Sequence, residues 1–259
     1  MFLKLLKRAL PLPDLREGET YLFVGAHPDD IEVGAGGTVA KLVDLKKKVY
    51  FVIITDGGCG SMDASIERDR LVKTRREEAL NAAKELKVED VSFLGFPDAG
   101  DYREYDVAKA LAPIILRINP DFVFAPDPNL PSEIHPDHLK AGNAVKMAML
   151  FSGYPLVYRD NVGAIPQTSE KAFRFRNLCF FFTHRANAFM SLDQVCVHAR
   201  KHAIMCHESQ FPNDEELKQI LKYLSIRSRI FGALGKRERE GFFALGPVHQ
   251  HCFSEVNRY

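Results

Sequence analysis

The strongest constraint on the fold is an alternation of short apolar runs with longer helical patterns through the first 150 residues. The runs are rich in β-branched and aromatic residues, and the segments between them carry apolar residues every three or four positions. This alternation is typical of βαβ units around a parallel sheet. We therefore predict an α/β fold with a doubly wound, mostly parallel sheet flanked by helices. The predicted strands are residues 21–26, 48–57, 90–96 and 121–127.

The segments between and after these strands predict the helices and the extent of the domain. A loop rich in Gly, Pro and Asn at 152–168 is interpreted as an insertion rather than a domain linker. We therefore expect a single domain over 1–259, with a core at about 20–150 and a C-terminal elaboration at about 151–259. Helices are predicted at 37–48, 65–86, 107–118, from 135 onwards, 195–209 and 214–234, with a further strand at 173–183.

Charge and cysteine usage narrow the class of partner. The 35 Lys and Arg residues balance 34 Asp and Glu residues, which leaves no basic field for nucleic acid. No run approaches the roughly 18 apolar residues of a membrane-spanning helix, and the basic residues among the first leucines predict an amphipathic segment rather than a secretory signal. The five cysteines lack CxxC spacing, which favours a reduced, cytoplasmic setting. We expect a small polar partner and leave a homo-oligomer open.

Two His-Pro-Asp sequences follow two of the predicted strands. His27 and Asp30 come after the first strand, and His138 comes after the fourth. In an open parallel sheet, ligands bind outside the carboxyl ends of the strands, where the strand order reverses. A strand order of 3-2-1-4-5 would bring both loops to that point. Two imidazoles and one carboxylate with an open fourth position are typical of a catalytic zinc site.

Three further side chains of these motifs are candidate catalytic groups. Asp29 is not needed as a ligand, so we interpret it as the general base beside the metal. His135 lies three residues before His138, and its protonated imidazole would stabilise an oxyanion or donate a proton to a leaving amine. Asp137 would accept a hydrogen bond from a histidine and fix its tautomer.

Several alternative functions fit parts of the pattern. HPD also marks J-domain co-chaperones, but there it lies between two helices, whereas both copies in this chain follow predicted strands. An NAD-binding oxidoreductase is opposed because GAGGT is not the GxGxxG fingerprint. We expect these glycines to let the helix start approach the metal loop instead. A zinc hydrolase of another amide and a non-enzymatic binding protein remain alternatives.

Together the motifs resemble the LmbE-like, or PIG-L-like, family of zinc-dependent N-acetylglucosaminyl deacetylases. AHPDDIEVGAGGT, TDGG, TRREEALNAAKELKV, LGFPDAG, HPDH and KHAIMCHESQF occur in the family's order over roughly residues 21–211. AHPDD with a distant HPDH is the most specific part. The resemblance implies a Rossmann-like fold and an N-acetylated sugar or glycoconjugate as substrate, hydrolysed at its acetamide to a free amine and acetate.

The resemblance also implies roles for individual residues. His27, Asp30 and His138 would hold zinc, or another divalent metal such as Fe²⁺, with Asp29 as the base and His135 as its acid or electrostatic partner. Arg75 of TRREE and Asp98 of FPDAG would touch sugar hydroxyls. His207 matches a family motif too, but we leave it out of the catalytic set. Residues after 211 match no motif, so the group attached to the sugar stays open.

Overall fold

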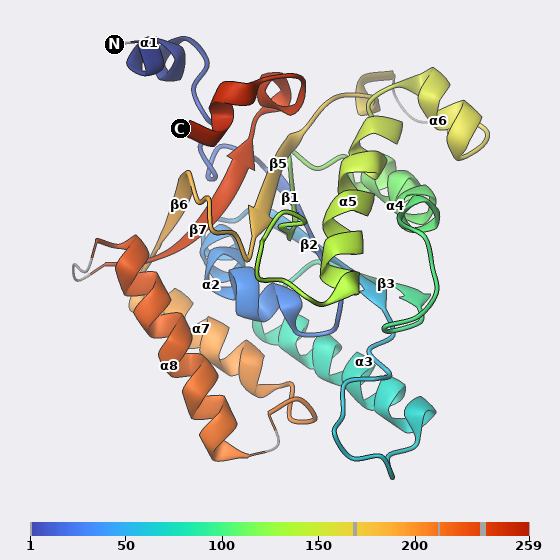
Figure 1. The fold of residues 1–259 in the computed structure, drawn as a ribbon, viewed down its shortest axis with the longest axis vertical. Coiled ribbons are helices and arrows are strands. Elements are labelled where there is room, and N and C mark those ends of the chain that lie inside the picture. The colour runs from blue at the N-terminus through green and yellow to red at the C-terminus, as the bar shows by residue number, and fades with distance from the viewer. Residues whose placement is uncertain (1, 168–169, 212, 234–236, 259) are drawn as a thin grey trace.

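One mixed sheet runs through the protein in the computed structural model (Figure 1). The structure describes residues 2–167, 170–211, 213–233 and 237–258, and every count below refers to these. The strand order is β3-β2-β1-β4-β5-β7-β6, parallel from β3 to β5, with β7 antiparallel to both of its neighbours. The predicted mostly parallel, doubly wound sheet is confirmed. The seven strands are Thr20–Gly25, Lys48–Thr55, Asp90–Phe96, Phe122–Pro126, Asn177–Phe181, Ala188–Leu192 and Glu238–Leu245, numbered β1 to β7.

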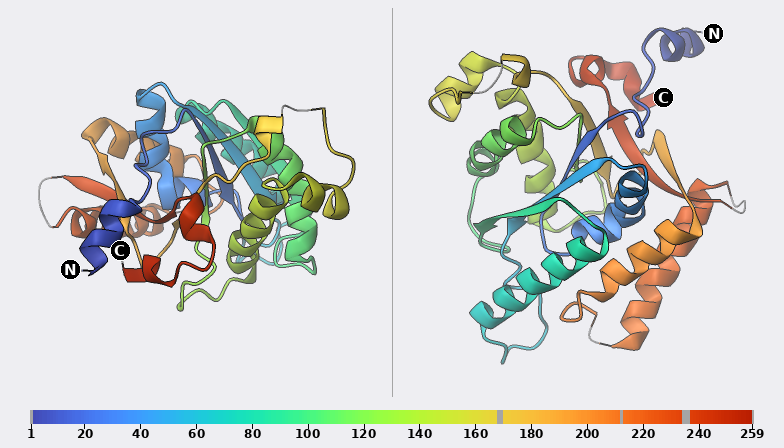
Figure 2. Two further views of the ribbon diagram at one scale, coloured as in Figure 1. Left: turned by 90° about the horizontal axis from the view of Figure 1, so that it is seen from above. Right: turned by 180° about the vertical axis from the view of Figure 1, so that it is seen from behind.

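Helices cover both faces of this sheet, as the views in Figures 1 and 2 show. Helices α4 and α5 pack on one face, α2, α3 and α7 lie on the other, and α8 packs against β7. No helix within the described residues is long and apolar enough to cross a bilayer. The helices α1 to α8 are Phe2–Ala9, Asp30–Asp44, Arg68–Glu85, Glu104–Ile118, Pro136–Phe151, Pro155–Asn161, Gln194–Met205 and Asp214–Phe231, and short 3-10 turns occupy Glu170–Ala172, Pro247–Gln250 and Ser254–Arg258.

Strand β1 lies at the centre of the core. Leu22 and Val24 pack with the residues of α4 and α5, and Tyr21 and Phe23 pack with those of α2. All four side chains are fully buried, as expected for a parallel strand covered on both faces. The ring of Phe23 stacks on Phe124 of the neighbouring β4 with 4.4 Å between ring centroids. The carboxyl ends of β1 and β4 are therefore held side by side.

Three elements lie where no helix or strand was predicted. Helix α6 begins at Pro155 inside the predicted loop, because proline is favoured in the first turn of a helix, where its missing N–H costs nothing. Strands β6 and β7 extend the sheet antiparallel beyond β5. A continuous sheet through both parts of the chain supports the proposal of a single domain. The last residue of the helix predicted to end at 234 lies outside the described residues.

The glycines of α2 have a different role from the predicted one. A Cβ atom at Gly34 would overlap the ring of Phe181 on β5, and one at Gly37 would meet Leu192 on β6 and the carboxylate of Glu240 on β7. The glycines therefore let α2 lie close to the C-terminal strands of the sheet, rather than to the metal loop.

Candidate metal and active site

The loops after β1 and β4 meet where the strand order reverses. Helix α2 begins at Asp30 and helix α5 at Pro136, so two helix N-termini lie at the same place. Both ends favour nearby negative charge, because their first N–H groups are unpaired within the helix. The carboxylate of Asp30 is held by the loop that precedes α2, since its Oδ2 accepts hydrogen bonds from the backbone N–H groups of Ala26 and His27 at 2.8 and 2.9 Å.

The three predicted ligands converge on one point. His27 Nδ1 lies 3.2 Å from His138 Nε2, and His138 Nε2 lies 3.1 Å from Asp30 Oδ1. One donor atom from each of the three lies within 4.8 Å of the others. Two imidazole nitrogens and a carboxylate oxygen so arranged are a donor set for a divalent cation. The segments that supply them are separated by more than a hundred residues along the chain.

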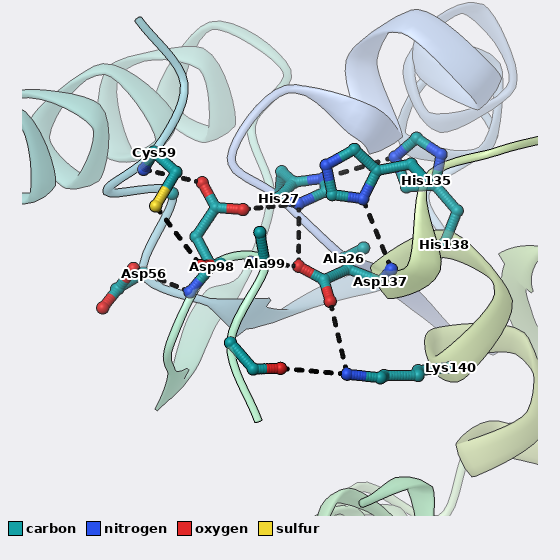
Figure 3. A network of polar contacts seen from close by, with 12 residues as sticks. Ala26, His27, Asp56, Cys59, Asp98, Ala99, His135, Asp137, His138 and Lys140 are labelled. Atoms are coloured by element: carbon teal, nitrogen blue, oxygen red, sulfur yellow. Dashed lines mark hydrogen bonds and ion pairs between the residues drawn. The ribbon is translucent and has the colours of Figure 1, made fainter. Parts of the chain in front are cut away.

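Each histidine of this set is oriented through its other ring nitrogen. His27 Nε2 lies 3.3 Å from Asp137 Oδ2 and 3.2 Å from Asp98 Oδ1 (Figure 3). A proton on Nε2 leaves the Nδ1 lone pair facing Asp30 and His138. Asp137, fully buried, is placed to accept a hydrogen bond from His27 in this tautomer.

Glu133 orients the second histidine and was missed from the sequence. Its Oε2 lies 2.7 Å from His138 Nδ1, and its Oε1 accepts from the backbone N–H of His135 at 2.8 Å. A proton on Nδ1 leaves Nε2 of His138 free for the metal. The only signal in the sequence was an acid five residues before His138 in SEIHPDH, which has no set spacing for such a partner.

The electrostatics of the three residues favour a bound cation. Burial alone would lower the pKa of His27, but hydrogen bonds to Asp137 and Asp98 and the charge of Asp30 outweigh it and raise that pKa to about 10. Burial likewise opposes charge on His138, and the Asp30 and Glu133 carboxylates raise its pKa to about 9. A place that draws protons onto two adjacent imidazoles is one where a cation compensates buried negative charge. The residues present therefore fit a divalent metal.

A second set of donors shares His27 and suits a metal less well. It consists of His27, Asp98, His135 and Asp137. Hydrogen bonds explain its short distances: Asp98 Oδ2 accepts from the N–H of Cys59 at 2.9 Å, and Asp137 Oδ2 accepts from the N–H of Ala99 at 2.8 Å. These carboxylates orient His27, and we assign the metal to the first set.

Asp29 lies beside the metal ligands in a strained backbone conformation. Its φ is 130°, which is rare for any residue except glycine and costs on the order of 1–3 kcal/mol. Its Oδ2 lies 3.2 Å from Arg75 Nη2. Burial raises the pKa of Asp29 to about 6, with the charge of Arg75 opposing the shift and that of Asp30 adding to it. Asp29 lines the cavity next to the ligand Asp30, and the ion pair with Arg75 holds its carboxylate there.

His135 is the N-cap of α5 and lies beside His27. Its Nδ1 accepts a hydrogen bond from the backbone N–H of Asp137 at 3.3 Å, and its ring centroid is 4.5 Å from that of His27. Burial and the charge of His27 lower the pKa of His135. Because Nδ1 accepts this hydrogen bond, a single ring proton would lie on Nε2. The role of His135 as an acid or electrostatic partner stays a prediction.

Arg75 and Asp98 line the same cavity, but both already bind residues of the site. Arg75 is 2% exposed and donates to the carbonyls of Gly57 and Pro28 at 3.0 and 2.8 Å. Asp98 holds His27 and the N–H of Cys59. Both residues position the loops around the metal ligands, and their contact with sugar hydroxyls stays a prediction.

The cavity has a volume of about 390 Å³, within the range of small-molecule sites. Besides the predicted residues it is lined by the loop after β2 and by Gln210, which follows α7. His207, three residues earlier, is fully buried and does not line the cavity; its Nε2 lies 3.5 Å from Glu32 Oε1. The lining residues are His27, Asp29, Asp30, Cys59, Gly60, Arg75, Asp98, Ala99, His135, His138 and Gln210.

The site lies at the switch point of a doubly wound sheet and combines two imidazoles and a carboxylate with an unliganded acid. This arrangement defines a class of metal-dependent hydrolases. Comparison with known proteins identifies the family within this class. Residues 22–149 match the PIG-L family, described as GlcNAc-PI de-N-acetylase. The diacetylchitobiose deacetylase of Thermococcus kodakarensis is 34% identical over 233 residues, covering 89% of this chain and 84% of that protein. The chain belongs to the PIG-L, or LmbE-like, family.

Other relatives agree with this assignment. The solved structure of N,N'-diacetylchitobiose deacetylase from Pyrococcus horikoshii superposes with a TM-score of 0.87 and 30% identity, covering 100% of this chain and 96% of that one. A 1D-myo-inositol 2-acetamido-2-deoxy-alpha-D-glucopyranoside deacetylase from Kineococcus radiotolerans is 26% identical over 54% of this chain and 47% of its own length. The predicted family and enzyme class, an amidohydrolase of the sugar-deacetylase type, are confirmed. This family is metal-dependent, which agrees with the donor set.

Proposed function

We propose that the protein removes the acetyl group from an N-acetylglucosamine-type sugar or glycoconjugate and releases a free amine and acetate. The observation that carries the proposal is the convergence of His27, Asp30 and His138 on one point, with the Asp29 carboxylate unliganded in the same cavity. The relatives named for diacetylchitobiose support this substrate class, because they match nearly the whole chain.

The metal in this proposal is zinc, held by His27 Nδ1, the Asp30 carboxylate and His138 Nε2. A donor set of two histidines and one carboxylate is typical of catalytic zinc, and Fe²⁺ is the alternative. When bound, zinc supplies Lewis-acid chemistry for a carbonyl and lowers the pKa of water to about 7. Asp137, Asp98 and Glu133 hold the two imidazoles in the tautomers that this binding requires.

Asp29 acts as the general base for the attacking water. Its carboxylate takes one proton while the water oxygen bonds to the acetyl carbon. Arg75 holds the carboxylate through Oδ2, which leaves the other oxygen for this proton. A base so placed contributes roughly 10²–10⁴-fold to a rate.

His135 donates from Nε2 to the oxygen of the tetrahedral carbon. The backbone N–H of Asp137 occupies its Nδ1, so Nε2 is the nitrogen that carries the proton in the neutral ring. When the carbon–nitrogen bond breaks, Asp29 returns its proton to the leaving amine. Acetate and the amine of the sugar are then the products, and one water is consumed.

The test is release of acetate from a panel of N-acetylated sugars, starting with diacetylchitobiose, by protein purified without chelator and analysed for metal. We expect one amine per acetate and one metal ion per chain. No acetate from any sugar, with metal bound, would contradict the proposal. Hydrolysis confined to amides that are not sugars would favour the alternative of another amide substrate.

We also propose that the protein works in the cytoplasm. All five cysteines are unpaired in the structure, and Cys179 and Cys196 are buried as ordinary apolar side chains. Free thiols persist in a reducing compartment. Cell fractionation with a cytoplasmic marker tests this, and recovery of the protein outside the cytoplasm would contradict it.

A further inference from the structure

The segment after α7 forms one wall of the cavity, although the predicted catalytic groups come from the loops after β1 and β4. The segment includes Ser209 and Gln210, and Gln210 lines the cavity together with the metal ligands. No role in the proposed mechanism uses it.

Helix α3 fixes this segment through a buried acid. Glu78 accepts from the backbone N–H of Ser209 at 2.7 Å and from its Oγ at 2.6 Å, and Glu78 is 8% exposed. Arg75 lies one turn earlier on the same helix and holds Asp29. One face of α3 therefore positions both the base and the segment opposite it.

The carboxamide of Gln210 is oriented by its nitrogen. Nε2 donates to the carbonyl of Gly60 at 3.0 Å and to Ser209 Oγ at 3.1 Å, which uses both of its protons. Among the described residues, no donor binds Oε1 of Gln210, and this oxygen is not buried away from the cavity and solvent. A fixed, accessible acceptor in a polar cavity calls for a donor from the ligand.

We propose that Gln210 is a substrate-binding residue, whose Oε1 accepts a hydrogen bond from a hydroxyl group of the sugar. This inference rests on the proposed function and adds to it a specificity contact from the C-terminal part of the chain. Ser209 and Glu78 are positioning residues for that contact, because they hold the amide without reaching the cavity through their own polar atoms.

The contact stabilises bound substrate and transition state alike, because a sugar hydroxyl takes no part in the chemistry. Its loss should raise KM and leave kcat nearly unchanged. One hydrogen bond to a neutral group corresponds to about a fivefold to tenfold change in binding. A purely structural role for Gln210 would instead disturb Gly60 and Arg75, and so lower kcat through Asp29.

The experiment is a double-mutant cycle in which one change is made in the protein and the other in the substrate. Gln210→Met keeps the length of the side chain without its hydrogen bonds, and Gln219→Met on the exposed surface of α8 is the matched control. Each protein is assayed for acetate release from the parent N-acetylglucosaminide and from its 3-, 4- and 6-deoxy analogues. Gln210→Glu, which retains a side-chain acceptor, serves if the methionine variant does not fold.

We expect Gln210→Met to raise KM about tenfold on the parent sugar, with kcat within about twofold. With the wild-type protein, one deoxy analogue should have a KM raised by the same factor relative to the parent sugar. With Gln210→Met, the KM for that analogue should rise no further, because the variant and the analogue each remove one partner of the same hydrogen bond. Fully additive effects on every analogue, or a loss of kcat without a change in KM, would overturn the inference. If the wild-type protein releases no acetate from any sugar, the proposed function fails and the inference fails with it.

Discussion

Two neighbouring acids in the AHPDD loop have opposite electrostatic environments. Burial alone would raise the pKa of Asp30, but the charge and hydrogen bond of His138 outweigh it and hold that pKa well below its ordinary value. Burial raises the pKa of Asp29 to about 6 instead. Acids whose pKa values are pushed apart take different roles: the first suits a ligand that stays ionised, and the second suits a base that must accept a proton.

Replacing the base should separate chemistry from metal binding. We expect Asp29→Ala to keep one metal ion per chain while acetate release falls by roughly 10²–10⁴-fold, because the ligands remain and the proton acceptor is lost. His138→Ala should lose the metal. Metal content and turnover measured on the same preparations check both statements. Near-normal turnover by Asp29→Ala would show that another group is the base.

Glu133 should control metal affinity although it is not a ligand. We expect Glu133→Ala to weaken metal binding about 10- to 100-fold, because His138 loses the partner that fixes its tautomer. Competition with a chelating dye measures the affinity without reference to turnover. Glu89→Ala removes an exposed acid before β3 and is the control. Equal affinity for the Glu133 variant and this control would show that the hydrogen bond has no influence on the metal.

At the scale of elements, the sequence predicted the apolar strands of the parallel part of the sheet and missed β6 and β7, of which β7 carries buried charge. Strand β7 begins with Glu238 and contains Glu240, and both are nearly buried because Arg200 of α7 pairs with them. Glu240 also accepts from backbone N–H groups of α2. Alternation and propensity cannot show that a charge will be compensated by a residue 40 positions away. The parallel strands needed no such partner.

The amino ends of β1 and β4 should give the fold a pH-dependent contribution. Asp121 accepts from the N–H groups of Glu19 and Thr20 at 2.8 and 3.1 Å and pairs with Arg174 at 2.9 Å. Burial alone would raise the pKa of Asp121, but these bonds lower it overall. The stability that Asp121 contributes is therefore fully present above its pKa in the unfolded chain, about 3.9. It is lost as the pH falls through the pKa of Asp121 in the folded protein, which is lower.

Asp121→Asn should accordingly lower the free energy of unfolding by about 1 kcal/mol at pH 7, since a partly exposed charged hydrogen-bond partner becomes neutral. Below about pH 4 the variant and the wild-type protein should approach each other. Urea unfolding at both pH values measures the difference. A difference that stays constant down to acidic pH would mean that the charge of Asp121 does not contribute.

At the scale of the molecule, the site could be predicted where it lies in contiguous motifs that follow strands. The strand order determines that the loops carrying His27 and His138 meet. The βαβ pattern predicts a doubly wound sheet, and 3-2-1-4-5, the order that we assumed, is one of the common orders of such sheets. Glu133 and Gln210 were not predicted as site residues, because their roles depend on a side-chain bond and on where a distant segment folds back. Single-residue contacts across the tertiary structure leave no periodic trace in a sequence.

Binding of one cation to this site should stabilise the whole chain. The ligands come from segments that are apart in the unfolded state, so a metal that binds only the folded protein adds about 2.7 kcal/mol at a concentration a hundred times its Kd. For a chain of this size each kcal/mol raises Tm by roughly 2–4 °C. We therefore expect chelation to lower Tm by several degrees and added Zn²⁺ to restore it.

The variant His138→Ala provides the decisive comparison, because it lacks one ligand and leaves the rest of the fold in place. Its Tm should be the same with chelator and with Zn²⁺, whereas Glu89→Ala should show the full wild-type shift. A wild-type Tm that is insensitive to chelation would show that the cation does not bind the folded state at this site. A shift that persists in His138→Ala would place the stabilising metal elsewhere in the protein, and the assignment of His138 as a ligand would then be wrong.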